Sequence, residues 1–241
     1  MRGLAAASHP LPGVAVTAFA TALALASGAS VATCALVAAA VLTGQLGIGW
    51  LNDLHDADLD VAAARPDKPL VRGAVDRRLL GWAVAASVPV CLVLSFALGV
   101  LPGLLHVVFV ASAWAYDLWL KPTPASAVPY LVSFGLLPAV AATAAGAEVS
   151  GTLVVAAALL GLGGHFANTL GDVAADALTD VRGLPQRLGP ARSQVAAGSC
   201  VVAACAVALG GLGSGVLSGA LLVTAGFRSP LTPSFRVSSG L

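Results

Sequence analysis

The stretch that decides the fold is VATCALVAAAVLTGQLGIGWL, residues 31–51, which runs directly into NDLHDADLD, residues 52–60. The apolar part has no charged side chain, and its length matches the roughly 20 residues that a helix needs to cross the hydrocarbon core of a bilayer. The polar part then places four aspartates within nine residues. This arrangement predicts a membrane-spanning helix that ends in a dense acidic segment at one surface of the membrane.

The composition of the whole chain agrees with this interpretation. Of its 241 residues, 58% are hydrophobic and only 10% are charged, and the mean hydropathy is +0.93. Soluble domains average about 25% charged residues, so the chain is predicted to be a polytopic membrane protein. A formal net charge of +1 gives no reason to expect a nucleic-acid partner. The four cysteines form neither a CxxC pair nor a set with histidine, so no soft-metal site is expected.

Eight apolar stretches are predicted to be transmembrane helices. They are residues 11–29, 31–51, 79–99, 101–120, 125–146, 149–170, 191–211 and 213–227. Strands are disfavoured because a bilayer leaves no partner for open backbone groups, and no alternating barrel pattern is present. The predicted fold class is therefore all-α: one polytopic transmembrane bundle of about eight helices over residues 1–241, with a polar tail at 228–241.

The connections between these stretches alternate in charge. Those at 27–30, 99–102 and 210–213 are uncharged, and the one at 145–148 carries a single acid. The other connections and the two ends hold the cations: Arg2, Arg65, Lys68, Arg72, Arg77, Arg78, Lys121, Arg182, Arg187, Arg192, Arg228 and Arg236. Because basic loops stay in the cytoplasm, both termini and all basic loops are predicted to lie there.

The acidic segment at 52–60, called the first ladder here, has a counterpart in NTLGDVAADALTD at 168–180, called the second ladder. Both follow predicted helices that end on the cytoplasmic side, so they could form one site. Polar residues recur every four positions: Asn52, Asp56 and Asp60 in the first ladder, and Asn168, Asp172, Asp176 and Asp180 in the second. On a helix this spacing produces a single stripe.

Carboxylates in such a stripe repel one another by roughly 0.2–0.5 kcal/mol per pair, and a bound cation would remove the conflict. Oxygen ligands without Cys or His select a hard ion such as Mg²⁺. The alternative is a solvated acidic helix end, which the helix dipole would oppose because the ladders follow their helices.

Basic segments follow each ladder closely, RPDKPLVRG at 65–73 and RGLPQRLG at 182–189. Cations beside metal-binding acids suit a diphosphate, whose charge requires both metal and Lys or Arg. The alternative is that these cations only set the membrane topology.

These segments resemble the UbiA-type intramembrane prenyltransferase superfamily. Residues 52–60 fit its NDxxDxxxD motif at every defined position, and residues 65–73 resemble the basic, proline-containing stretch that follows. Asp172 and Asp176 match its DxxxD motif, and residues 184–189 match the Leu-Pro-x-Arg-Leu-Gly-like tail.

The segment YDLWLK at 116–121 resembles the turn after the family's fourth helix, so the resemblance extends from about residue 45 to 190. Relatives usually have nine transmembrane helices, one more than the eight expected here. Asp180 stands where many relatives carry glycine and is expected to have a supporting role.

The resemblance implies that the substrate is an isoprenyl diphosphate whose head binds Mg²⁺ at the cytoplasmic mouth of the bundle. The implied metal ligands are Asn52, Asp56, Asp60, Asp172 and Asp176. The groups implied to contact the substrate are Lys68, Arg72, Tyr116, Lys121, His165, Asn168 and Arg182. Asp56, Asp172 and Lys68 are the residues expected to matter most for catalysis.

The implied reaction is ionisation to an allylic carbocation, which an aromatic or other hydrophobic acceptor attacks. An apolar cavity within the lipid keeps water away from the cation. The prenyl tail is expected to leave through a lateral opening between helices into membrane lipid.

Several alternatives remain open at this point. A membrane-bound terpene cyclase of the same superfamily would bind the same diphosphate but use an internal double bond as the nucleophile. A divalent-cation carrier would need its acids at the bilayer midplane, and an inactive relative would act only as a partner subunit. His165 and Tyr116 could instead serve packing alone, and Asp117 could orient an acceptor.

Overall fold

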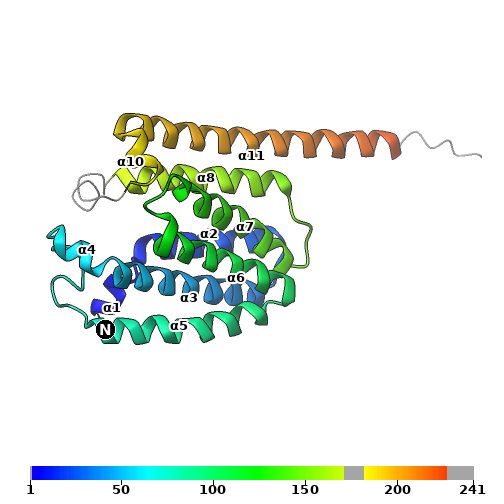
Figure 1. Ribbon diagram of the computed structural model, residues 1–241. Coiled ribbons are helices and arrows are strands. Elements are labelled where there is room, and N and C mark those ends of the chain that lie inside the picture. The colour runs from blue at the N-terminus through cyan, green and yellow to red at the C-terminus, as the bar shows by residue number, and fades with distance from the viewer. Residues whose placement is uncertain (1, 171–181, 227–241) are drawn as a thin grey trace, which may run out of the picture.

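A computed structural model describes the backbone of residues 2–170 and 182–226 and the side chains of 2–170 and 182–211, and all the regular secondary structure in this part of the chain is helical (Figure 1). The helices are α1 (Arg2–Ala7), α2 (Pro10–Ala26), α3 (Val31–His55), α4 (Ala57–Ala62), α5 (Arg77–Ala97), α6 (Val100–Ala115), the π-helix η1 (Tyr116–Leu120), the 3₁₀-helix η2 (Pro124–Ala127), α7 (Val128–Ala144), α8 (Gly151–Leu170), α10 (Leu184–Leu188) and α11 (Pro190–Gly226). The predicted all-α fold class is confirmed.

Six helical segments within the described residues are long and apolar enough to cross a membrane. They are Val31–His55, Arg77–Ala97, Val100–Leu120, Pro124–Ala144, Gly151–Leu170 and Pro190–Gly211. The apolar helix α2 is shorter, at 17 residues. The chain is therefore a multi-pass integral membrane protein.

The prediction of two separate helices at 191–211 and 213–227 is wrong, because α11 continues through the glycines at 210–213 as one helix of 37 residues. A glycine costs a helix only about 1 kcal/mol, whereas a break in lipid would leave backbone groups without partners. Gly211 instead allows close packing: a Cβ there would lie 2.3 Å from Cγ2 of Thr152 on α8. The described part of the chain thus holds seven apolar helices, six long ones and α2.

The core of the bundle lies between α2, α3, α6 and α7, where small side chains surround a few larger ones. Its buried members include Ala20, Val37, Phe109 and Leu137. Small residues let helix backbones approach closely in lipid. Helix α11 lies at one edge of the bundle against α8 (Figure 1).

The connections with charged residues gather at one end of the bundle. The ends of α3 and α8, the short helices α1, α4 and α10, and the loop at 63–76 all lie there (Figure 1). This end collects the polar residues that form the candidate site, while the rest of the bundle remains apolar.

Candidate functional site

The spacing of the first ladder predicts one uninterrupted helix, but the structure divides this segment between two helices. Helix α3 ends at His55 and α4 begins at Ala57, with Asp56 as the residue between them. The i to i−4 backbone bonds nevertheless persist, from Asp56 N to Asn52 O at 2.9 Å and from Asp60 N to Asp56 O at 2.8 Å. The stripe therefore survives the break in the helix.

The aspartates of the first ladder fall into two groups. Asp53, Asp56 and Asp60 are buried, with exposed fractions of 1%, 6% and 6%. Asp58 is exposed and pairs with Arg77 on the surface, at 2.9 Å. Buried carboxylates require partners, so the first three need compensating groups close by, whereas Asp58 does not.

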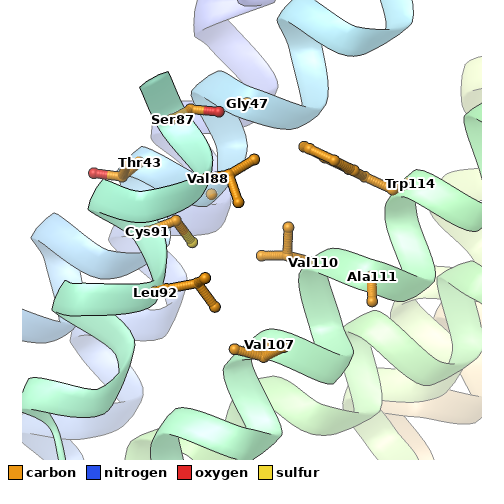
Figure 2. A pocket seen from close by; sticks show the side chains of 11 residues that line it. Thr43, Gly47, Ser87, Val88, Cys91, Leu92, Val107, Val110, Ala111 and Trp114 are labelled. Carbon is orange, nitrogen blue, oxygen red and sulfur yellow. The ribbon is translucent and has the colours of Figure 1, made fainter. Parts of the chain in front are cut away.

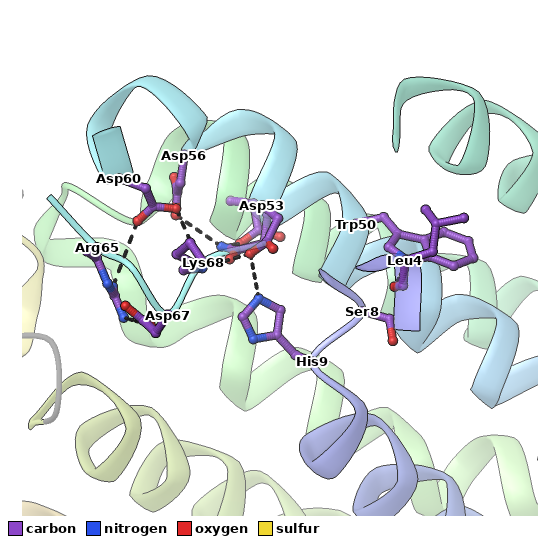
Figure 3. Close-up of polar contacts among 12 residues, drawn as sticks. Leu4, Ser8, His9, Trp50, Asp53, Asp56, Asp60, Arg65, Asp67 and Lys68 are labelled. Atoms are coloured by element: carbon purple, nitrogen blue, oxygen red, sulfur yellow. Dashed lines mark hydrogen bonds and ion pairs between the residues drawn. The ribbon is translucent and has the colours of Figure 1, made fainter. Parts of the chain in front are cut away.

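Lys68 is the main partner of the buried carboxylates on the side of the basic loop (Figure 3). Its Nζ lies 2.7 Å from Oδ1 of Asp53 and 3.7 Å from Oδ2 of Asp60, and the side chain is buried. Arg65 approaches Asp60 at 3.9 Å and hydrogen-bonds Asp67 at 3.2 Å. The loop predicted to offset substrate charge thus folds back over the ladder.

The π-helix η1 supplies the partners on the other side. Asn52 Nδ2 donates to Oδ1 of Asp117 at 3.0 Å and to Oδ2 of Asp56 at 3.3 Å. Lys121 Nζ pairs with Asp56. The amide of Lys121 bonds the carbonyl of Tyr116 at 2.9 Å, the wider turn of a π-helix, which is often found at functional sites. Asp117 therefore lies in direct contact with the first ladder, and its role toward an acceptor stays a prediction.

A cluster of rings lies next to this site. The rings of Tyr116 and Tyr130 are 5.8 Å and 4.7 Å from that of His165, and Asn168 follows His165 near the end of α8. His165 Nε2 is 3.1 Å from Oγ of Ser126. His165 is buried, and its Nδ1 has no hydrogen-bond partner among the described residues.

The structure describes the residues before and after the aspartates of the second ladder, but Asp172, Asp176 and Asp180 themselves lie outside the described residues. Leu184, a few residues after this ladder, donates its backbone N–H to Ser126 Oγ at 2.9 Å. The end of α8 before it and α10 after it both lie at the end of the bundle that holds the first ladder (Figure 1). The metal-binding role of Asp172 and Asp176 stays a prediction.

The other two predicted basic residues are not brought into contact with the first ladder. Arg72 is exposed and forms no ion pair within the described ranges. Arg182 is also exposed, and its carbonyl accepts a hydrogen bond from Arg187 at 2.8 Å.

The donor set fits a hard divalent cation. The three buried side chains of the first ladder offer only carboxylate oxygens, the type that Mg²⁺ prefers, and Oδ2 of Asp53 and of Asp117 are buried without a partner among the described residues. Burial raises the pKa of Asp60 despite the nearby Lys68, as expected for a carboxylate with too little compensating charge. Among the described residues no group of three acidic, His or Cys side chains could hold a metal ion by itself.

A lateral crevice of about 140 Å³ opens between α3, α5 and α6 (Figure 2). Trp114, one turn before Asp117, closes one end of it, and Leu92 and Val107 lie toward the other end. The crevice is lined by Thr43, Gly44, Gly47, Ser87, Val88, Cys91, Leu92, Val107, Val110, Ala111 and Trp114.

One contact of the site had no counterpart in the sequence analysis. His9, at the start of α2, places Nε2 2.8 Å from Oδ1 of Asp53. A single histidine before a proline in an uncharged segment carries no pattern from which this contact could be predicted.

Comparison with known proteins gives a consistent result. The family model described as the UbiA prenyltransferase family matches residues 14–231. Digeranylgeranylglyceryl phosphate synthase of Thermococcus kodakarensis is 29% identical over 163 residues, which cover 67% of this chain and 58% of the relative. The synthase of the same name from Thermococcus gammatolerans is 30% identical over 64% of this chain and 56% of its own length. The chain thus spans less than two thirds of these curated relatives.

Solved structures share the fold. A UbiA homologue from Archaeoglobus fulgidus bound to GPP and Mg²⁺ superposes with a TM-score of 0.72 at 18% identity, covering 85% of this chain and 76% of the homologue. The apo structure of a UbiA homologue from Aeropyrum pernix K1 gives a TM-score of 0.69 at 25% identity, over 83% of this chain and 78% of that one.

Proposed function

Because the chain belongs to the UbiA prenyltransferase family, we propose that it is an Mg²⁺-dependent intramembrane prenyltransferase that moves an isoprenyl group from a prenyl diphosphate to a hydrophobic acceptor. The observation that carries the proposal is the buried cluster at the end of α3. Asp53, Asp56 and Asp60 are held there by Lys68 and Lys121, directly above an apolar bundle. The site faces the cytoplasm in this proposal, as the basic loops predict.

Metal binding is assigned to both ladders. Asn52, Asp56 and Asp60 would hold Mg²⁺ together with Asp172 and Asp176. When bound, the metal supplies charge neutralisation that makes the diphosphate a better leaving group. An A. fulgidus homologue binds GPP and Mg²⁺, which supports the same pairing of ligands for this chain.

Lys68 and Lys121 pair with carboxylates in the protein without substrate. A lysine has three N–H donors, so Lys68 can keep Asp53 and still donate to a phosphate oxygen. Their positions on two sides of the ladder suit a diphosphate, which carries charge on both phosphates. Arg72 and Arg182 are also assigned to the diphosphate head group, whose negative charge they would help to offset.

In this proposal the ring cluster surrounds the allylic carbon of the prenyl group that is bonded to the diphosphate. Tyr116 and Tyr130 present aromatic rings to a developing cation, which ring faces stabilise. His165 and Asn168 border the same space, where His165 would contact the acceptor or the diphosphate. The apolar bundle excludes water from this region, so that the acceptor can capture the cation instead.

The crevice between α5 and α6 is assigned to the isoprenyl tail. It begins at Trp114, one turn from Asp117, and reaches Val107, a distance of about 10 Å along a helix. A tail placed there would keep its head at the ladder and extend into lipid between the helices.

A radiochemical assay in reconstituted membranes tests the function. Labelled dimethylallyl, geranyl and geranylgeranyl diphosphates are supplied with Mg²⁺ and either an aromatic acceptor or a prenylated glyceryl phosphate, the latter because of the name of the T. kodakarensis relative. Acceptor-dependent, chelator-sensitive product is expected. Cyclised product without any acceptor would favour the terpene cyclase, and Mg²⁺ uptake into vesicles without turnover would favour the carrier.

A further inference from the structure

The N-terminal segment, residues 2–9, packs against the end of α3 that carries the first ladder. Trp50 Nε1 donates to the carbonyl of Leu4 at 2.9 Å. A Cβ on Gly49 would lie 2.4 Å from the carbonyl oxygen of Ser8, so the two backbones are in direct contact. Ala7 is fully buried with Val75 and Leu80. The segment is thus a fixed part of this end of the bundle.

His9 ends this segment in a backbone conformation that few residues other than glycine adopt, with φ 49° and ψ 63°. It precedes α2 but makes no side-chain cap for that helix. Its ring turns to the first ladder, with Nε2 2.8 Å from Oδ1 of Asp53 (Figure 3). An unusual backbone conformation that serves a contact across 44 positions suggests a functional constraint.

Asp53 links His9 to Lys68 through a single atom. Its Oδ1 contacts His9 Nε2 at 2.8 Å and Lys68 Nζ at 2.7 Å, while its Oδ2 is buried without a partner among the described residues. Among the described residues, no hydrogen bond on Oδ2 opposes a rotation of this carboxylate. The contact with His9 therefore fixes the orientation of Asp53, and with it the position of Lys68 near Asp60.

We propose that His9 is a positioning residue for the diphosphate site, acting through Asp53 on Lys68. This inference rests on the proposed function, since it assigns Lys68 to the diphosphate. With Asp53 held in place, Lys68 Nζ lies between the two carboxylates of the ladder, where it meets the incoming head group. Without His9, Asp53 turns toward solvent and Lys68 follows it away from Asp60.

Kinetics of His9→Ala test the proposal. The KM for the prenyl diphosphate should rise about tenfold with kcat changed much less, because a contact made equally in ground and transition states is weakened. His9→Gln, which retains an N–H donor, should restore most of the loss. The matched control is His55→Ala, an exposed histidine at the end of the same α3. Equal effects of the two alanine variants would overturn the proposal.

A double-mutant cycle shows whether His9 acts through Lys68. In a Lys68→Ala background the additional effect of His9→Ala on KM should vanish, because coupled residues are not additive. Full additivity of the two substitutions would overturn the proposed path.

A third measurement does not depend on the enzyme activity. Acylation of lysines by an N-hydroxysuccinimide ester, followed by mass spectrometry of the metal-free protein, should label Lys68 several times faster in His9→Ala than in the wild type, with labelling of Lys121 as the internal reference. Unchanged labelling of Lys68 would overturn the proposal even if the prenyltransferase function holds. Faster labelling in a protein without prenyl transfer would retain the positioning role and reject the proposed function alone.

Discussion

Helices α3 and α6 contribute to both the acidic end and the lateral crevice, yet the two regions have opposite chemistry. Helix α3 lines the crevice with Thr43 and Gly47 and then, one to two turns later, supplies Asn52 and Asp53. Helix α6 lines it with Val107 and Trp114 and continues into η1, which supplies Asp117 and is followed directly by Lys121. Position along a helix axis therefore separates a charged region from an apolar one, an arrangement that suits the charged head and apolar tail of the proposed substrate.

The largest effect is expected from the charged end. Asp56→Ala should reduce product formation by about a thousandfold or more, because it removes an expected metal ligand and the ion pair between Asp56 and Lys121. Asp58→Ala is the matched control, since Asp58 lies two residues away, is exposed and pairs only on the surface. The measurement is the initial rate of product formation in the reconstituted assay. Equal losses in both variants would mean that burial of an aspartate does not distinguish the site residues from the others.

Lys68→Ala should lower kcat/KM for the prenyl diphosphate by about a hundredfold, the value of one charge-assisted hydrogen bond. It also leaves Asp53 buried with His9 as its one remaining partner within the part of the chain that the structure describes, so thermal unfolding should be measured in parallel. Arg78→Ala, an exposed cation on the adjacent α5, is the control. A Lys68 variant with wild-type kcat/KM would remove this residue from the diphosphate site.

The crevice should respond to bulk and not to charge. Leu92→Trp should reduce the use of geranylgeranyl diphosphate about tenfold relative to dimethylallyl diphosphate, since a pocket discriminates hydrocarbon by size. Val93→Trp places the same ring on the next residue of α5, which is exposed on the bundle surface, and should not change this ratio. Competition between the two labelled donors measures the ratio of geranylgeranyl to dimethylallyl diphosphate used. An unchanged ratio for Leu92→Trp would mean that the tail does not bind in this crevice.

The smallest effect is expected on stability, from the packing of the apolar helices α7 and α8. A Cβ on Gly161 would lie 2.5 Å from Cβ of Phe134 and 2.6 Å from the carbonyl oxygen of Tyr130, so α7 and α8 touch there. Gly161→Ala should lower the apparent Tm in detergent by about 3–8 °C, as overpacking of a tight contact does. Gly164→Ala, with open space around it, should not lower the Tm, and a similar loss there would reject the packing explanation.

Much of this architecture was predictable from the printed sequence. Uncharged stretches of about 20 residues must become helices in lipid, whatever their neighbours, because the backbone can bond only to itself there. The four-residue spacing of Asn52, Asp56 and Asp60 likewise predicted a stripe, which survives the break at Asp56. The basic loop was predicted beside the ladder, and Lys68 lies there.

Other features were not predictable from local pattern. The glycines at 210–213 indicated a turn, but Gly211 packs against Thr152 within a continuous α11. Glycine is typical of both turns and close helix contacts, so only the position of the neighbouring helix distinguishes them. The π-turn at Tyr116–Leu120, which directs Asp117 to Asn52, also has no signature in residue types alone.

By itself the sequence determined that this protein crosses the membrane as helices, keeps its charge at their ends and places acids and bases in alternating short segments. These properties follow from hydropathy and spacing, which act over a few turns of one chain segment. Only the tertiary structure decided that Asp53 is buried while Asp58 is exposed, and that His9 and Lys68 meet on one carboxylate oxygen. Such contacts join residues far apart in the chain, and their formation depends on how the helices pack against one another.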